Sequence, residues 1–498
     1  MPFMEAIRKN ITDSENDSVT ENGAHGYRTS GKKLLDLNFS VSSLRERSED
    51  EVRTAFIEAF DEDPVTAIKW LFYARDVRGG LGERRLFRIA LTELAEREKE
   101  LVRAVLPLVP EYGRWDDLWC LFDTPLSNDV FCMVEDQLNA DMYNQLYGKS
   151  VSLLAKWMPS LNTSSKKTRA LARRMAHSLG WSEKTYRTTL SCLRDRIKVV
   201  ERDMSANRWG DIPYPSVPSR ANLIYRDAFM RHDPERRTEY LNEVNGGRTS
   251  IHSGTLFPGD IVHKNGYKRD DSCEALWNAL PNIIAKGEGT MVVADGSGSM
   301  TWCSTAGGMT PWEVAHALAI YFAERMTGEF KDRYITFSSH PRFVDLSSCG
   351  SLYDKLTEAR KHSDCSNTDI EAVFRMILDT ASANEMTQDD LPKNILIISD
   401  MEFDAPSQHF GAKLFDKIRK DYESHGYRIP RLIFWNVASR TGTIPVIEND
   451  LGVALVSGYS PNTAKMVMSG KLDPYECLLE TLNSERYQPV EDAIRGLS

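Results

Sequence analysis

Hydrophobic residues recur at helical spacing through the first half of the chain. Between about residues 40 and 245, apolar positions follow the period of amphipathic helices, and runs typical of strands are scarce. One helix is predicted to begin at Pro64, where VTAIKWLFYARDV follows with its apolar residues at helical spacing. Successive helical pairs favour a solenoid of stacked pairs, although no strict sequence period establishes a regular repeat.

The pattern changes after Gly287. The short apolar runs TMVVAD, RYITFSS, NILIISD, RLIFWNV and VALVSG alternate with amphipathic helices, and DPYECLLETLNS forms a last helix. This alternation predicts an α/β domain with a parallel, doubly wound sheet. The polar start of the chain, rich in Ser, Thr, Asn, Asp and Gly, predicts a flexible arm. We therefore expect an arm over residues 1–32, a helical module over 33–285 and the α/β domain over 286–498.

Length and composition fit a protein of two or three domains. The chain has 498 residues and a formal net charge of −10, so any nucleic-acid site must be a local basic patch. None of the eight cysteines forms a Cys-x-x-Cys pair, which is typical of reduced intracellular thiols. No signal-peptide core and no apolar run of the roughly 20 residues needed to span a bilayer is present. We expect a cytoplasmic protein without a membrane segment.

Two of the predicted strands end in an acidic residue. Asp295 continues as Asp-Gly-Ser-Gly-Ser, which adds the hydroxyls of Ser297 and Ser299, and Asp400 closes NILIISD. In open α/β sheets, ligands bind beyond the carboxyl ends of the strands. Hard oxygen ligands of this kind suit Mg²⁺ or Mn²⁺. The alternative is that these are ordinary turn residues.

This pattern resembles the metal-ion-dependent adhesion site of the von Willebrand factor A domain. That family adds a threonine from a second loop, and Thr368 in SNTDI stands at the expected place. The resemblance implies that Ser297 and Ser299 ligate directly, and that Asp295 and Asp400 act directly or through water. It also implies an open position for solvent or for a partner's Glu or Asp. The nearby acids are expected to cap loops rather than bind the metal; they are Asp369, Glu402 and Asp404.

The Gly-rich, basic segment 75–85 (RDVRGGLGERR) has the composition of a phosphate-binding loop. It lacks the Gly-Lys-Ser/Thr ending of a P-loop and follows a predicted helix rather than a strand. A turn between two helices is therefore the favoured interpretation.

Residues 156–208 contain 13 Lys or Arg against 4 Asp or Glu, with aromatic residues between them. Such a composition suits single-stranded RNA, because cations pair with phosphates while bases stack on rings. A solvated basic face with the aromatics in the core explains it equally well. The candidate RNA contacts are Lys156, Lys166, Lys167, Arg169, Arg173, Arg174, Lys184, Arg187 and Arg194.

Several segments resemble an uncharacterised family with a TROVE-like helical module and the same C-terminal domain. They are FYARDVRGGLGERRLF, EYGRWDDLW, AKWMPS, TYRTTLSCLR, IPYPSVPS and ISDMEFD. More distantly, the architecture is similar to that of the Ro ribonucleoprotein autoantigen. In that protein a ring of HEAT-like helical repeats binds misfolded RNA ends in its hole and structured RNA on its rim. The resemblance implies RNA binding; the helical module is either a closed ring or an open arc.

Three functions therefore remain open. The leading hypothesis is a Ro-like RNA-binding protein whose metal site engages a carboxylate-bearing protein partner. The alternative is an adaptor that acts through the metal site without RNA. A metal-dependent enzyme is the least favoured, because neither a histidine partner for Ser297 nor a second metal is evident from the sequence. We expect a binding protein and not an enzyme.

Overall fold

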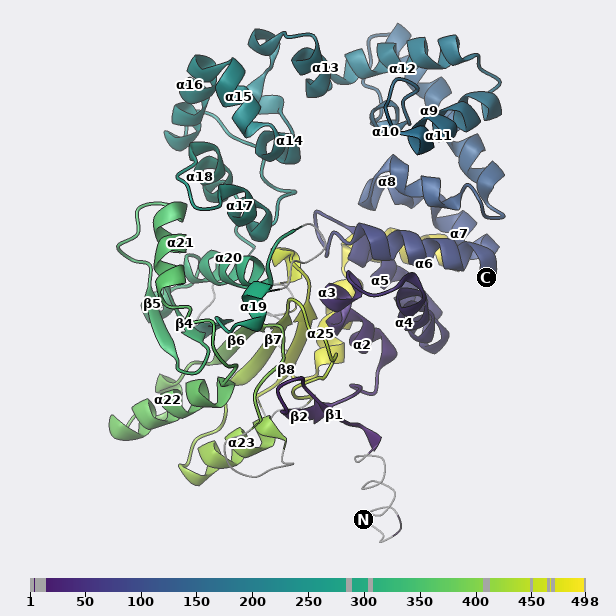
Figure 1. The fold of residues 1–498 in the computed structure, drawn as a ribbon. Coiled ribbons are helices and arrows are strands. Elements are labelled where there is room, and N and C mark those ends of the chain that lie inside the picture. Colours follow the sequence, from purple (N-terminus) through teal and green to yellow (C-terminus); the bar gives the residue numbers. More distant parts are fainter. Residues whose placement is uncertain are drawn as a thin grey trace. The chain divides into compact units, whose positions relative to one another are not determined.

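The computed structural model describes residues 4, 15–283, 289–302, 308–405, 413–447, 451–463, 466 and 471–496 (Figure 1). Contacts between residues divide the chain into two compact units. The sheet unit comprises residues 1–67 and 253–484, and the helical unit comprises 68–252 and 485–498. The N-terminal part is thus largely helical, and the C-terminal part contains a mixed sheet.

These units differ from the ranges expected for the domains. The early helices α2 (Lys33–Phe39) and α3 (Val41–Leu44) belong to the sheet unit and not to the helical one. The reason is packing, because α2 buries Leu34, Leu35 and Phe39 and contacts strand β8 (Val453–Ser457). A helical pattern in the sequence does not say which unit its apolar face will join.

The sheet has six strands in the order β5-β4-β3-β6-β7-β8. All neighbouring pairs are parallel except β4 and β5, which form an antiparallel pair at one edge. The sheet is therefore mixed and not wholly parallel as the sequence predicted. The sequence pattern did not reveal β5, the short antiparallel edge strand. The strands are β3 (Thr290–Asp295), β4 (Arg333–Phe337), β5 (Arg342–Asp345), β6 (Asn394–Ser399), β7 (Arg431–Asn436) and β8.

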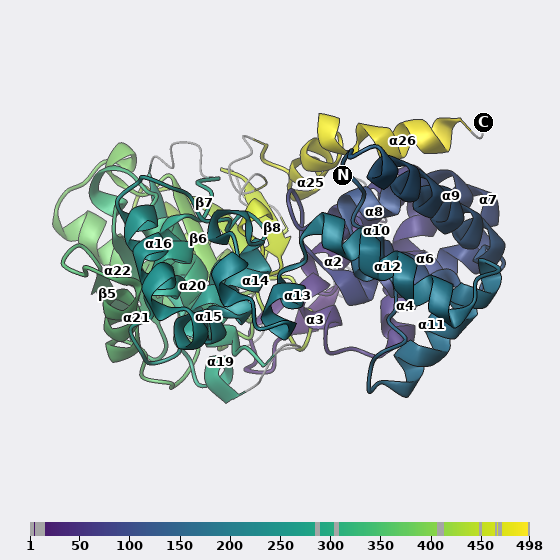
Figure 2. The same cartoon turned by 90° about the horizontal axis from the view of Figure 1, so that it is seen from above.

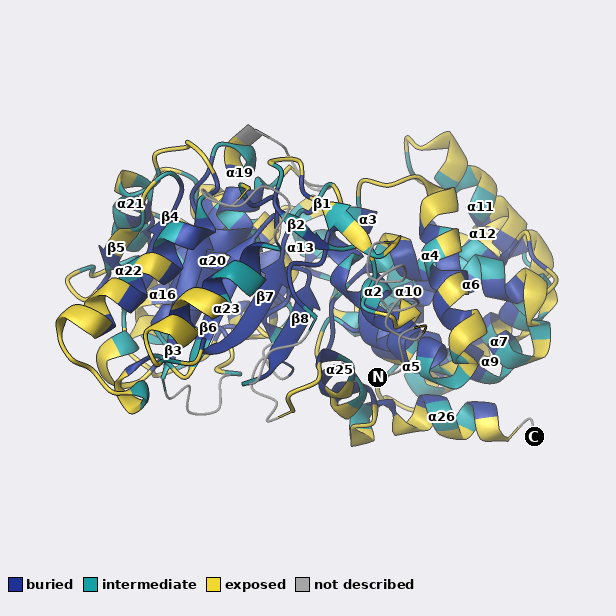
Figure 3. Ribbon diagram, turned by 90° about the horizontal axis from the view of Figure 1, so that it is seen from below, coloured by how far each residue is buried: buried dark blue, intermediate teal, exposed yellow. Residues whose placement is uncertain are grey.

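Helices cover both faces of this sheet, as the side chains of β7 show. Trp435 meets Phe322 of helix α20 (Pro311–Ala323), with ring centroids 5.3 Å apart. Its neighbour Phe434 meets Phe415 of helix α23 (Leu414–Ser424) at 5.0 Å. Successive residues of a strand point to opposite faces, so α20 and α23 lie on opposite sides. Figure 3 shows the buried strands and the exposed outer surfaces of α22 and α23.

The other helices of the sheet unit complete these layers. The helix α22 packs beside α23, while α17 packs against α20. Their bounds, with the remaining helices of this unit, are α4 (Glu49–Glu62), α17 (Pro258–Asn265), α18 (Asp271–Asn278), α19 (Ser299–Trp302), η5 (Gly328–Phe330), α21 (Leu352–Lys361), α22 (Ile370–Ala383), η6 (Gln388–Asp390), η7 (Pro461–Thr463) and α25 (Pro474–Leu482).

A short β-hairpin stands where the sequence predicted a flexible arm. Strands β1 (Asp17–Val19) and β2 (His25–Tyr27) pair antiparallel. Tyr27 exchanges two backbone hydrogen bonds with Ile444, each 2.8 Å long. The hairpin is thereby tied to the loop after β7 by long-range bonds that local polarity does not reveal.

The helical unit is built from consecutive packed helices, of which α9, α10, α11 and α12 lie together (Figure 2). Its buried apolar residues include Val130 and Leu138 of α9 and Leu190 of α12. The helices are α5 (Pro64–Arg75, which spans the boundary), α6 (Arg84–Arg97), α7 (Lys99–Val105), η1 (Leu106–Leu108), α8 (Val109–Tyr112), η2 (Trp115–Leu121), α9 (Ser127–Leu146), α10 (Leu154–Trp157), α11 (Lys166–Ser178), α12 (Glu183–Ile197), α13 (Val200–Ser205), η3 (Trp209–Asp211), η4 (Tyr214–Ser216), α14 (Ser219–Ile224), α15 (Arg226–His232), α16 (Pro234–Asn245), η8 (Glu485–Tyr487) and α26 (Gln488–Arg495).

The Gly-rich segment is a turn between α5 and α6, as the sequence predicted. A Cβ on Gly80 would lie 1.9 Å from the carbonyl oxygen of Tyr73, so a larger residue does not fit there. The buried carboxylate of Asp76 pairs with Arg486 of η8, with Arg486 Nη2 2.8 Å from Asp76 Oδ1. The turn therefore anchors the C-terminal segment within the helical unit.

A buried ion cluster links further motifs of this unit. Asp117 of η2 is fully buried and accepts hydrogen bonds from Arg75 at 2.7 Å and from Arg88 at 2.8 Å. Charged pairs of this kind are costly to break once buried. The segments FYARDVRGGLGERRLF and EYGRWDDLW therefore have a structural role in common.

Within the described stretches, no helix is both long and apolar enough to cross a lipid bilayer.

Candidate metal centre

The loops that carry the five predicted metal ligands meet near the middle of the sheet. Strand β3 pairs in parallel with β4 on one side and with β6 on the other, so later strands are added on opposite sides of β3 and a topological switch point lies between β3 and β6. Such a switch point is where open α/β sheets bind ligands. Asp295 is the last residue of β3, and Asp400 directly follows β6. The two carboxylates therefore leave adjacent parallel strands at the same edge.

The loop after β3 directs oxygen atoms toward one another. Asp295 Oδ1 accepts a hydrogen bond from Ser297 N at 2.8 Å, and the hydroxyls of Ser297 and Ser299 lie 3.1 Å apart. Asp295 Oδ2 accepts a second bond from the Ser399 hydroxyl at 2.6 Å. One carboxylate and two hydroxyls are thus held in a single tight loop.

The two glycines of this loop are required by close packing. A Cβ on Gly296 would lie 2.8 Å from the Thr336 hydroxyl, and one on Gly298 would lie 2.9 Å from the Cys365 carbonyl oxygen. Neither glycine has a positive φ. They are therefore needed because neighbouring loops pack closely against their backbone, and not because the backbone itself adopts a left-handed conformation.

The loop that carries Thr368 is attached to the first loop through its backbone. Gly298 N donates to Ser366 O at 3.0 Å, and Cys365 N donates to Gly296 O at 3.2 Å. Thr368 follows two residues later and is buried. The second loop is thereby brought against the Asp-x-Ser-x-Ser loop.

Two residues of these loops have left-handed backbone. Met401, which follows Asp400, has a φ of 63°, and Cys365 has a φ of 54°. Left-handed backbone at a residue other than glycine costs roughly 1–2 kcal/mol. Strain of this kind persists where the surrounding structure fixes the chain, and it is frequent at functional sites.

Both carboxylates are held in an environment that disfavours their charged form. Asp295 and Asp400 are almost completely buried. Burial raises the pKa of both groups, and the charge of Asp400 raises the pKa of Asp295 further. A hydrogen bond from Ser299 and the charge of Arg440 partly offset this at Asp400. Two neighbouring buried carboxylates are the arrangement that a cation would stabilise.

The available donors fit a hard divalent cation. Asp295, Asp400, Ser297, Ser299 and Thr368 offer carboxylate and hydroxyl oxygens, which Mg²⁺ and Mn²⁺ prefer. Among the described residues, those of the candidate centre included, no group of three or more His, Cys, Asp or Glu side chains is gathered for a metal. The candidate centre differs from such a group because three of its five candidate ligands are hydroxyls and only two are carboxylates.

The nearby acids cap loops, as expected. Asp369 accepts a bond from Ala372 N at the start of α22, and Asp404 accepts one from Thr368 N at 3.1 Å. Glu402 is fully buried and accepts backbone bonds from Glu21 at 2.8 Å, Arg440 at 2.7 Å and Thr441 at 2.9 Å. Glu402 therefore ties two other segments, the hairpin and the loop after β7, to its own, and so holds three segments together around the site.

Sequence reasoning missed two groups that border the centre. Arg440, in the loop after β7, lies with its Nη2 3.6 Å from Asp400 Oδ2. Asn22, at the tip of the hairpin, donates from Nδ2 to the Thr368 hydroxyl at 3.3 Å. Neither belongs to a local motif, so no pattern in the sequence marks them.

The candidate RNA-binding residues of the helical unit fall into two groups. Arg194 is half-buried and donates to Ala155 O, Met158 O and the Ser160 hydroxyl, which fixes the segment after α10. Contacts with protein groups also hold Lys156 over Trp157, Arg169 at Thr163 O, Arg173 at Glu183 and Arg174 at Asp123. The rest are exposed and form no ion pair with any described residue; they are Lys166, Lys167, Lys184 and Arg187.

The aromatic residues of the segment also divide. Tyr186 is buried, and its hydroxyl donates to Pro159 O at 2.8 Å, so it belongs to the core. Trp209 is half-buried and stacks on His232 with centroids 4.3 Å apart. The exposed rings lie instead at the end of α9, where Tyr143 and Tyr147 pack 4.6 Å apart. Their position lies before the basic segment, which is why sequence reasoning missed them.

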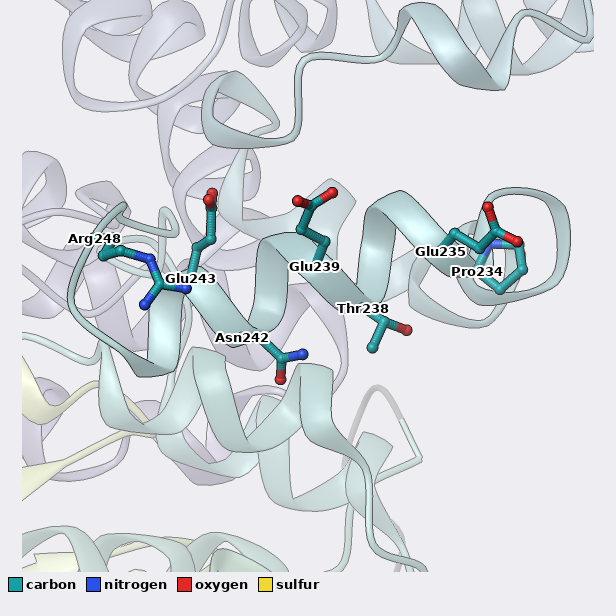
Figure 4. Close-up of a pocket in the computed structure, with 7 residues that line it drawn as sticks. All are labelled: Pro234, Glu235, Thr238, Glu239, Asn242, Glu243 and Arg248. Atoms are coloured by element: carbon teal, nitrogen blue, oxygen red, sulfur yellow. The ribbon is translucent and has the colours of Figure 1, made fainter.

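A hollow of about 600 Å³ runs along α16 in the helical unit (Figure 4). Glu235, Glu239 and Glu243 line it, against a single cation at Arg248. The excess of negative charge does not suit a phosphate. This hollow therefore is not part of the basic surface.

Comparisons with known proteins point to relatives without an assigned function. A family model described as Domain of unknown function (DUF2828) matches residues 20–100 and 120–285. A second model, described as Domain of unknown function (DUF7788), matches residues 289–492. An uncharacterized protein of Acanthamoeba polyphaga mimivirus is 27% identical to this chain over 95% of the chain and 89% of its own length.

A solved structure is also similar. It is the crystal structure of the Deinococcus radiodurans Ro (RSR) protein, with 14% identity and a TM-score of 0.33 over 85% of this chain and 91% of that chain. The family models and the mimivirus relative together fit the uncharacterised family that the sequence motifs indicated.

Proposed function

We propose that this protein is a Ro-like RNA-binding protein that also docks a carboxylate-bearing protein partner through a divalent cation. The observation that carries the docking half is the burial of Asp295 and Asp400 beside the hydroxyls of Ser297 and Ser299. The RNA half rests on exposed cations and rings in the helical unit, together with the Ro-like architecture expected from the sequence.

The docking half rests on the positive charge that a bound cation would present to the carboxylate of a partner. Asp295, Asp400, Ser297, Ser299 and Thr368 would hold the ion. A bound Mg²⁺ or Mn²⁺ would supply a positive charge for the Glu or Asp side chain of a partner. The chain's own groups set the loops in place, chiefly through the hydrogen bonds of Glu402.

The RNA half requires cations that other protein groups do not already neutralise. Lys166 and Lys167 begin α11, while Lys184 and Arg187 lie on α12, and the two helices pack together. Tyr143 of α9 and Tyr147, which directly follows α9, are exposed, and Gln145 Nε2 lies 2.7 Å from Cys192 Sγ of α12. The same group of helices thus presents phosphate-binding cations and rings on which bases can stack.

Binding of fluorescent single-stranded RNA to the purified full-length protein tests this half. Phosphate contacts predict that log affinity falls with log salt at a slope of about −0.7 for each phosphate neutralised. Replacing Tyr143 and Tyr147 by Ala should cost about 1–3 kcal/mol per stacked base. Tyr267→Ala is the matched control, because Tyr267 is an exposed tyrosine of the sheet unit. Absent or salt-independent binding would reject the RNA half.

The alternative is an adaptor that uses the metal site without RNA. Its specific support is that all five candidate ligands belong to the sheet unit, whereas the candidate RNA contacts belong to the helical unit. Partner capture from cell extract separates the two proposals. Partners that persist after RNase treatment but leave with EDTA favour the adaptor, whereas partners lost with RNase favour the ribonucleoprotein.

We propose a binding role rather than catalysis for the same site. The Ser297 hydroxyl lies beside the Ser299 hydroxyl, and no hydrogen bond joins it to a histidine within the described residues. The nearby His316 is buried, which lowers its pKa to about 3, and its Nδ1 lies 3.0 Å from the Tyr334 hydroxyl. These features support docking; a nuclease or phosphatase assay with Mg²⁺ tests them directly.

A further inference from the structure

The tip of the N-terminal hairpin lies against the loops of the candidate metal centre. The Thr20 hydroxyl donates to Phe403 O at 2.6 Å, and Ala405 N donates to Asn22 O at 3.1 Å. Gly23 forms a β-bridge with Asp404. The tip is therefore fixed along the segment that directly follows Asp400.

Asn22 contacts one of the predicted ligands. Its Nδ2 donates to the Thr368 hydroxyl at 3.3 Å and to Glu402 O at 2.6 Å. The Asn22 side chain is exposed, while Thr368 beneath it is buried. An amide of this chain thus stands between solvent and a ligand of the centre.

Glu21 brings a carboxylate to the same edge. Glu21 Oε2 lies 2.6 Å from Arg440 Nε, and Arg440 Nη2 lies 3.6 Å from Asp400 Oδ2. One guanidinium therefore connects the chain's own exposed carboxylate to a buried ligand. An incoming carboxylate would meet an arginine that is already paired.

We propose that the β1–β2 hairpin is an internal occupant of the metal centre. Asn22 and Glu21 at its tip hold the place that the carboxylate of a protein partner takes. This inference rests on the proposed docking function. A docking partner of this kind carries an exposed Glu or Asp and displaces the hairpin tip. The hairpin thereby makes docking depend on the release of a segment of the same chain.

Water-proton relaxation of Mn²⁺ bound to the full-length protein tests the proposal, because it reports the water that reaches the ion. The double variant Glu21→Ala with Asn22→Ala removes both side chains at the tip. In a six-coordinate shell, one additional water should raise the relaxation per bound ion by roughly 1.5- to 2-fold. Both side chains are exposed, so the fold should tolerate the change.

Asn16→Ala is the matched control. The Asn16 side chain bonds to Thr29 N and O at the base of the hairpin, away from the metal loops. A rise in the tip variant without one in the control supports the proposal. Equal relaxation per bound ion in all three proteins overturns the hairpin's role but leaves the metal site standing. Failure of the wild-type protein to bind Mn²⁺ rejects the metal centre itself.

Discussion

Asn22 Nδ2 lies 3.3 Å from the Thr368 hydroxyl, although 346 residues separate them in the chain. The contact joins the start of the chain to a loop of the α/β sheet. It makes the candidate metal centre a site built from four segments: the hairpin, the loop after β3, the loop before α22 and the segment after β6.

A divalent cation should stabilise the protein. The cation offsets the negative charge of two buried carboxylates. At a hundredfold excess over its Kd it should add about 2.7 kcal/mol to the free energy of unfolding. Thermal unfolding with Mg²⁺, Mn²⁺ or EDTA measures the effect. The shift should vanish in Asp295→Asn with Asp400→Asn and persist in Asp389→Asn with Asp421→Asn, two exposed positions of the same unit. An equal shift in both variants would place the cation elsewhere.

Glu402→Gln should destabilise the sheet unit by about 2–3 kcal/mol, because a buried amide cannot replace a carboxylate that accepts several N–H groups. Urea unfolding followed by tryptophan fluorescence measures this loss. Glu423→Gln changes an exposed glutamate of α23 and serves as the control. If both variants unfold alike, Glu402 does not hold the three segments together.

Reversing the unpaired cations should weaken RNA binding at every sequence tested. The triple variant Lys166→Glu, Lys167→Glu and Lys184→Glu should reduce the salt slope by about 0.7 for each lost phosphate contact. The equally charged control changes three exposed lysines of the sheet unit, namely Lys268, Lys331 and Lys420. Equal losses in the two variants would mean that net charge, not this surface, governs binding.

Arg194 and Arg187 lie on the same helix but should behave in opposite ways. Arg194→Ala removes three hydrogen bonds from a charged donor and should cost at least about 1.5–3 kcal/mol of stability. Arg187→Ala changes an exposed side chain and should alter stability by less than about 0.5 kcal/mol. Only the Arg187 variant should weaken RNA binding. A reversed result would contradict the assignment of structural and binding roles.

Local sequence patterns were sufficient for the core of the candidate site. Asp295 and Asp400 end apolar runs, and such runs form adjacent strands whose ends meet. The hairpin was not predictable, because its polar residues are ordered by bonds to residues far along the chain, among them Phe403 and Ile444. Charge alone likewise could not separate Arg194, which binds backbone carbonyls, from the exposed lysines.

The docking proposal depends on a divalent cation bound at Asp295 and Asp400. Titration of the full-length protein with Mn²⁺, followed by electron paramagnetic resonance of the free ion, detects such binding without any partner. We predict one bound ion per chain that is lost in Asp295→Asn with Asp400→Asn and retained in Asp389→Asn with Asp421→Asn. No bound ion in the wild-type protein, or equal binding by the first variant, would contradict the claim.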